Sequence, residues 1–149
     1  MPGLEAGRKR AAGDPFRSGV VPGEFDAAPR TFGLLATAEL YARVTGDHRY
    51  DDFAAGQLAW VFGANAWGTG FVVGAGDLCP YCPHHQVANL AMSHTGRGDI
   101  LRGAVVNGPN DAGLLSDRDA VDAARPCAYA PDDFTSTALY ALSLAVGRT

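Results

Sequence analysis

The sequence predicts an all-α fold whose helices are joined by long loops rich in glycine and proline. Two segments with helical patterns, residues 31–44 and 50–62, are separated by a short turn, and a third segment, residues 134–146, is rich in alanine and leucine. The 19 glycines and 9 prolines indicate shaped loops without reaching a disordered composition. A chain of 149 residues lies in the usual range of single domains, so one core is expected.

The first 29 residues are expected to be an extended lead-in to the domain formed by residues 30–149. They contain Gly13-Asp14-Pro15 and Val21-Pro22-Gly23 and show no sustained helical or strand period.

The segment Thr31–Val44 is apolar in nearly every direction of a helical wheel, which predicts a buried helix. Thr31 is a candidate cap at its start and Gly46 at its end. The segment Tyr50–Phe62 is apolar on one side, with Gln57 among its polar interruptions. Two helices joined by a tight turn form an antiparallel hairpin. One hairpin partner cannot cover the first helix on all sides, so we expect exposed apolar surface.

Gly63 is expected to end the second helix, because glycine adopts the left-handed cap conformation and the following chain is aperiodic. The loop beyond it holds Trp67, Phe71 and the pair His84-His85. Aromatic faces and imidazoles suit a polar ring-shaped ligand such as a sugar. A loop folded on its own aromatic residues is the alternative.

The remaining elements are a short helix expected over residues 87–93, one short strand pair and the last helix. Val105-Val106 is expected to pair with Val72-Val73. Asp132 or Asp133 is expected to cap the helix that runs to Val146.

The composition argues against nucleic-acid and membrane partners. The formal net charge is −4, and Arg8-Lys9-Arg10 is the only basic cluster. No apolar run approaches the ~18 residues that span a bilayer. The basic start is not followed by the apolar run of an export signal, and the localisation stays open.

Three cysteines imply no disulfide framework, and two of them form Cys79-Pro80-Tyr81-Cys82. This motif looks like the active site of a glutaredoxin, although that context needs a preceding strand and a long amphipathic helix after it. Alternatively, Cys79 and Cys82 hold zinc together with His84 or His85, with Cys127 as a candidate further ligand, because the spacing of the two thiolates suits that metal. Plain loop cysteines are the third reading.

Five motifs in order resemble the carboxy-terminal part of glycoside hydrolase family 9, the cellulase family. The resemblance spans roughly Arg30 to Val146. The motifs are Thr45-Gly46-Asp47-His48-Arg49-Tyr50, Phe62-Gly63-Ala64-Asn65-Ala66, Phe71-Val72-Val73-Gly74-Ala75-Gly76, Pro83-His84-His85-Gln86 and Gly103-Ala104-Val105-Val106-Asn107-Gly108-Pro109-Asn110.

The resemblance implies part of a six-hairpin (α/α) toroid and the inverting hydrolysis of β-1,4-glucans, without a cofactor. An inverting glycosidase needs an acid and a base whose carboxyl groups lie ~6.5–9.5 Å apart. The complete toroid has twelve helices, far more than this chain predicts. Members of the family are typically secreted.

The resemblance also implies site residues. His84 matches the family's substrate-holding His, His85 its neighbour, and Gln86 stands in place of an Arg. Gln86 keeps hydrogen-bonding capacity but lacks the charge and the fork of a guanidinium. With Trp67 and Phe71, His85 and Gln86 are the candidate substrate contacts, and His84 and Asp117 are the candidate catalytic residues.

The two catalytic carboxylates of the family are missing. Asp117 matches the Asp of the acid signature, but Pro126 stands where the acid Glu belongs, and every Glu of the chain lies upstream. The base motif Asp-Ala-Gly-Asp is absent, and Ala12-Gly13-Asp14 resembles it by chance. We therefore expect a fragment or degenerate relative that is inactive alone and has an upstream part of the same domain as its partner. The alternative is a non-catalytic carbohydrate-binding or zinc-stabilised module.

Overall fold

The computed structural model describes residues 1–22, 26–79, 102–109 and 132–147. Within them the chain forms four helices: α1 (Pro2–Gly13), α2 (Ala27–Thr45), α3 (Asp51–Val61) and α4 (Asp132–Val146). The described residues contain one isolated β-bridge and no longer strand. The all-α prediction is confirmed.

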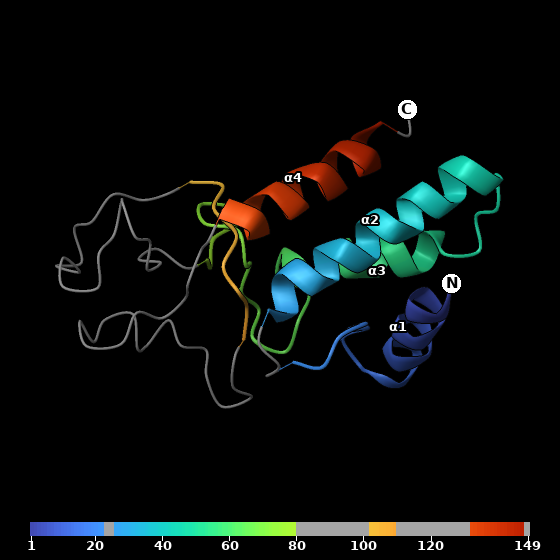
Figure 1. Cartoon of the computed structure of the whole chain (residues 1–149). Coiled ribbons are helices and arrows are strands. Elements are labelled where there is room, and N and C mark those ends of the chain that lie inside the picture. Colours follow the sequence, from blue (N-terminus) through green and yellow to red (C-terminus); the bar gives the residue numbers. More distant parts are fainter. Residues whose placement is uncertain (23–25, 80–101, 110–131, 148–149) are drawn as a thin grey trace, which may run out of the picture.

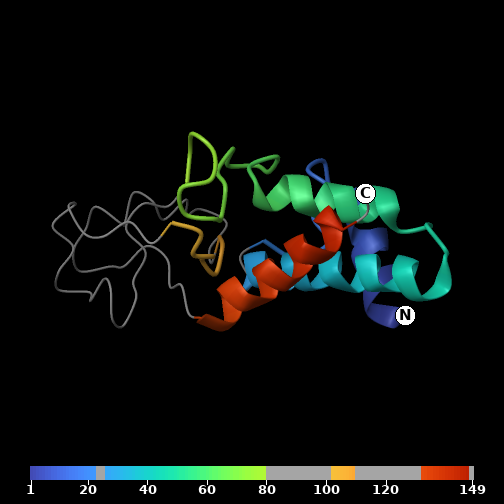
Figure 2. The same ribbon diagram turned by 90° about the horizontal axis from the view of Figure 1, so that it is seen from above.

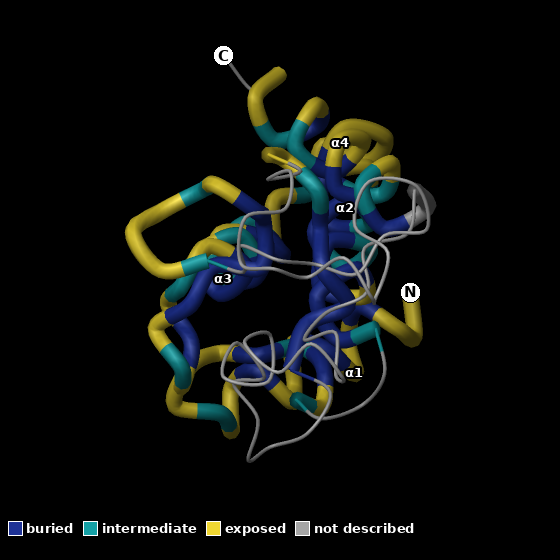
Figure 3. Tube along the Cα trace, turned by 90° about the vertical axis from the view of Figure 1, so that its left-hand side faces the viewer, coloured by how far each residue is buried: buried dark blue, intermediate teal, exposed yellow. Residues whose placement is uncertain are grey.

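Helix α2 is the centre of the fold, and the other helices pack around it (Figure 1). Figure 3 shows α3, α4 and α1 on different sides of the buried α2. Alanines at positions 27, 28, 36, 38 and 42 of α2 are buried, and their small side chains let neighbouring helices approach closely. The prediction that this helix is buried on most sides is confirmed.

The start of α2 differs from the prediction. The helix begins four residues before Thr31, after Asp26, whose backbone is left-handed (φ 65°). Thr31 therefore lies inside the helix, where its hydroxyl donates to the Ala27 carbonyl (2.8 Å). Gly46 ends the helix in the left-handed conformation (φ 69°), and its N–H donates to the Ala42 carbonyl (2.9 Å). The cap at Thr31 is wrong, and the cap at Gly46 is confirmed.

Helices α2 and α3 form the predicted antiparallel hairpin. They lie side by side in Figure 1 and in the view from above in Figure 2. Asp47 organises the turn between them by accepting hydrogen bonds from the Tyr41 hydroxyl (3.0 Å) and from the Arg49 backbone N–H (3.0 Å). The backbone hydrogen bond of Arg49 is the main cause that lowers the pKa of Asp47, followed by those of Tyr41 and the Arg49 side chain. The first of the five motifs is therefore a structural turn.

Helix α1 replaces most of the predicted extended lead-in, which is wrong for Pro2–Gly13. Leu4, Gly7 and Ala11 form its buried face. A Cβ on Gly7 would lie 3.1 Å from the Phe53 ring, so glycine permits this close approach. The Tyr50 hydroxyl on the hairpin donates to Glu5 (2.5 Å). Glycines weaken a helix by ~1 kcal/mol each relative to alanine, and here tertiary contacts stabilise a segment with a poor intrinsic pattern.

Helix α4 buries Phe134, Ala138, Ala141 and Leu144, while Leu139 and Val146 lie exposed. At its end the Arg43 guanidinium of α2 donates to the Leu144 carbonyl (2.6 Å). Individual apolar side chains are thus exposed, as expected. That they form one continuous apolar patch stays a prediction. No helix in the described ranges is long and apolar enough to cross a membrane.

Candidate functional site

The loop that follows α3 lies at the end of the helices opposite the turn of the hairpin (Figure 1). Helix α3 ends at Val61, within one residue of the prediction, and Gly63 takes a positive φ of 117°. The Ala64 N–H donates back to the Ala59 carbonyl (2.9 Å). The chain therefore leaves the helix in a fixed direction.

Asn65 braces this loop through four hydrogen bonds and is itself 5% exposed. Its side-chain amide donates to the carbonyls of Trp60 (2.7 Å) and Thr69 (2.8 Å). Its side-chain oxygen accepts from the backbone N–H groups of Trp67 (3.1 Å) and Thr69 (3.4 Å). This organising role is missing from the sequence prediction, although the motif Phe62-Gly63-Ala64-Asn65-Ala66 contains the residue.

Trp67 and Phe71 both pack against the ring of the buried Trp60. The Trp67 ring meets Trp60 edge to face, with centroids 6.5 Å apart, and is only partly buried. The Phe71 ring lies 5.1 Å from Trp60, and this residue is 4% exposed. Phe71 is thus part of the core that supports the loop, whereas Trp67 offers aromatic surface to a ligand. Among the predicted substrate contacts, we keep Trp67 and assign Phe71 a supporting role.

A short antiparallel ribbon continues the loop and confirms the predicted pairing of two valine pairs. Val72 and Val105 form the bridge. The Val73 N–H donates to the Ala104 carbonyl (2.9 Å), and the Val106 N–H donates to the Phe71 carbonyl (3.1 Å). Both valine pairs are buried, so the ribbon fastens the loop to the core.

Two residues that flank positions 80–101 both contact Gly74 at the tip of this ribbon. The Gly74 N–H donates to the Cys79 Sγ (3.1 Å). A Cβ on Gly74 would lie 3.1 Å from the Arg102 side chain, and φ is 77°. His84, His85 and Gln86 follow Cys79 in sequence and lie outside the described residues, as do Asp117 and the short helix expected over residues 87–93. These expectations stay predictions.

Of the candidate zinc ligands, the structure describes Cys79 alone. Cys79 is half-buried and free. Cys82 and Cys127 lie outside the described residues. Across the parts of the chain that the structure does describe, no group of three or more His, Cys, Asp or Glu side chains could hold a metal ion.

The described part of the loop does not hold a catalytic carboxylate pair. Asp77 is the one acidic residue between Gly63 and Cys79, and it is exposed. Inverting hydrolysis needs a second carboxyl on the other side of the scissile bond. The described part of the loop therefore does not hold both carboxyl groups that the two proton transfers require.

Comparison with known proteins identifies the family. Residues 27–136 match the model of glycosyl hydrolase family 9. Endoglucanase B of Cellulomonas fimi is 32% identical over 103 residues, which are 64% of this chain and 10% of that protein. Endoglucanase A of Bacillus pumilus is 32% identical over 89 residues, 56% of this chain and 14% of that protein. The matched part thus spans a small fraction of these relatives.

Solved structures show the same fold. The family 9 endoglucanase J30 superposes with a TM-score of 0.71 at 25% identity, over 95% of this chain and 28% of that chain. The cellulase Cel9M of C. cellulolyticium, solved with cellobiose, has a TM-score of 0.63 at 20% identity, over 83% of this chain and 29% of that one. The described helices are therefore part of an (α/α)6 toroid. This chain belongs to glycosyl hydrolase family 9.

Proposed function

We propose that this chain forms the substrate side of an endo-β-1,4-glucanase catalytic domain with inverting chemistry, and that it binds β-1,4-glucan without hydrolysing it alone. The observation that carries the proposal is the loop around Trp67, a partly exposed indole held edge-on by Trp60 and braced by Asn65. A flat aromatic face held in one orientation suits the apolar face of a glucose ring. The loop is fixed in advance, so little conformational freedom is lost on binding.

The class of substrate is supported by the relatives. The two sequence relatives described above are endoglucanases, and Cel9M was solved with cellobiose. The family match favours this function over a separate carbohydrate-binding or zinc-stabilised module.

We assign His84 to holding the sugar beside the cleavage point, with His85 and Gln86 as further contacts. The neutral amide of Gln86 replaces the charged fork of the family's Arg, so we expect weaker binding here. Asp117 is the proposed remaining member of the acid signature. Since Pro126 occupies the position of the acid Glu, proton donation to the leaving oxygen requires a group from outside this pattern.

Isothermal titration of the full chain with cellotetraose tests the proposal. Trp67→Ala should weaken binding by about tenfold or more, equivalent to ~1.4 kcal/mol. Tyr140→Ala is the matched control, because Tyr140 is a half-exposed aromatic residue on α4. Equal affinities of both variants and the natural chain would refute the role of Trp67. Gln86→Arg should tighten binding if Gln86 lies in the Arg position of the site.

A further inference from the structure

Helix α4 has two opposite faces that differ in exposure but not in chemistry. The face toward the core is buried and consists of Phe134, Ala138, Ala141 and Leu144. The opposite face, here called the outer face of α4, is exposed and consists of Ser136, Leu139, Tyr140, Ser143 and Val146. At ~100° per residue, the residues of the outer face fall within an arc of about 120°, so they form one side of the helix.

Helix α2 covers only the buried face of α4. The Arg43 guanidinium of α2 donates to the Leu144 carbonyl (2.6 Å) on that side. Among the described helices, α2 alone packs extensively on α4, and Figure 3 shows α4 and α1 on different sides of α2. On the outer face, Leu139 is 69% exposed and Val146 is 74% exposed. The described part of the chain therefore leaves this face open.

The outer face of α4 carries no charge. No charged residue occurs between positions 134 and 147. The Ser143 hydroxyl donates within its own helix, to the Tyr140 carbonyl (2.7 Å). A helix at a protein surface normally has charged or polar residues opposite its apolar stripe, whereas a helix that is apolar on all sides is buried. The outer face thus has the composition of a buried surface.

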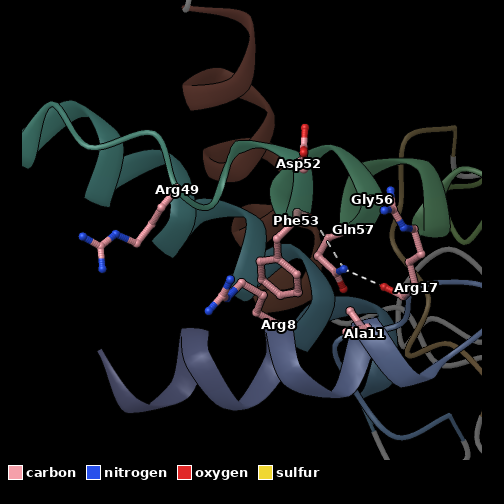
Figure 4. Close-up of a pocket in the computed structure, with 9 residues that line it drawn as sticks. Arg8, Ala11, Arg17, Arg49, Asp52, Phe53, Gly56 and Gln57 are labelled. Atoms are coloured by element: carbon pink, nitrogen blue, oxygen red, sulfur yellow. Dashed lines mark hydrogen bonds between the residues drawn. The ribbon is translucent and has the colours of Figure 1, made fainter.

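Helix α1 shows what a water-exposed helix of this protein looks like. Its exposed residues include Glu5, Arg8, Lys9 and Arg10. Figure 4 shows the side chain of Arg8 beside the Phe53 ring, at a cleft between α1 and α3 whose lining also includes Asp52. The lack of charge on α4 is therefore a property of this helix and not of the protein surface in general.

We propose that the outer face of α4 is the surface on which a further helix of a family 9 toroid packs. The superposition on J30 covers 95% of this chain but 28% of J30, so the described helices correspond to one sector of a ring. In a closed ring each helix has neighbours on two sides, and α2 occupies one side of α4. A helix with an apolar stripe fits the other side, because burial of apolar surface is the main favourable term. The fold match supports this assignment independently of the proposed glucan binding.

Lysine substitutions in this chain and in J30 test the proposal. In this chain, Leu139→Lys combined with Val146→Lys should shift the midpoint of thermal unfolding by less than ~2 °C, because both side chains are exposed. Lysines at the two J30 positions that superpose on Leu139 and Val146 should lower the midpoint of J30 by about 5 °C or more, because unpaired charges would be buried between two helices. If that J30 variant fails to fold, alanines at the same positions should still lower the midpoint.

An unchanged midpoint of J30 would show that this face is open to water in the complete toroid, and would overturn the proposal. An equal loss in this chain would show that the face is already covered here, which also overturns it. Sedimentation equilibrium identifies a second copy as the occupant instead, if J30 is unchanged and a dimer of this chain is dissociated by the two lysines. Ala55→Lys combined with Ala59→Lys, at exposed positions of α3, is the matched control and should leave sedimentation unchanged.

Discussion

Replacing Gln57 by methionine should destabilise the fold, although the sequence presents Gln57 only as a polar interruption of α3. Gln57 is fully buried on α3, and its amide joins the loop after α1 to the hairpin through the Arg17 carbonyl and the Gly19 N–H, both at 2.8 Å. Methionine has a similar length and shape but neither hydrogen-bonding group. Each partner left without a hydrogen bond costs ~1–3 kcal/mol, and both partners are only partly buried. We therefore expect a loss of about 2–3 kcal/mol.

Urea unfolding followed by circular dichroism measures this loss as a change in the free energy of unfolding. Thr37→Val is the control, because the Thr37 hydroxyl donates only within its own helix, to the Gly33 carbonyl (2.7 Å). This variant should change stability by less than ~1 kcal/mol. The reasoning is refuted if Gln57→Met unfolds at the same urea concentration as the natural chain, since the amide would then contribute nothing to holding the loop.

Three further predictions concern the packing of α1 and the loop after α3. Gly19→Ala should cost ~1–3 kcal/mol of stability, because its Cβ would lie within 3.0 Å of Gln57 and Phe53. Gly33→Ala has open space around it and should gain up to ~1 kcal/mol. Urea unfolding in which both variants change stability in the same direction would contradict this. The Tyr50 hydroxyl, first, and then Arg8 lower the pKa of Glu5 below 4.5. Glu5 thus contributes stability that is present above pH 4.5 and lost as pH falls through the lowered pKa. Glu5→Gln should therefore reduce the fall of stability at acid pH. An unchanged fall would argue against the hydrogen bond between Tyr50 and Glu5. Asn65→Ala should cost about 2–3 kcal/mol and red-shift tryptophan emission as Trp67 loses its support; unchanged emission would show that the loop holds without it.

The helices of the hairpin could be predicted from the sequence because their apolar pattern is strong. The all-round apolar character of α2 matches its central place, and Gly46 ends it by the expected left-handed cap. The pairing of Val72 with Val105 could also be predicted, since both are β-branched residues in short apolar runs. Local signals were sufficient for these elements.

Elements that depend on tertiary contacts could not be predicted in the same way. Helix α1 contains Gly3 and Gly7 and has Leu4 as its one large buried side chain, so its helical pattern is weak until it packs on Phe53. Gln57 interrupts the apolar pattern of α3, yet its position four residues after Phe53 places both on one face. That spacing was the available signal.

The candidate site was predictable in part for the same reason. Trp67 stands out in the sequence as an aromatic residue among glycines, and the structure leaves it partly exposed. Phe71 has the same appearance in the sequence but is buried against Trp60, because the ribbon turns it inward. Composition does not distinguish two aromatic residues in one loop, and only the backbone path decides which of them faces a ligand.

The release of reducing ends from a soluble β-1,4-glucan, measured beside the binding of cellotetraose, tests the central claim most directly. The claim is that this family 9 chain positions a glucan but lacks the carboxylate pair that cleaves it. Groups that act as a unit do not leave additive fractions of activity, so binding should occur with no hydrolysis above the buffer control. Hydrolysis by the chain alone that Asp117→Asn abolishes would contradict the claim, and Asp132→Asn and Asp133→Asn would then test which residue replaces the missing acid.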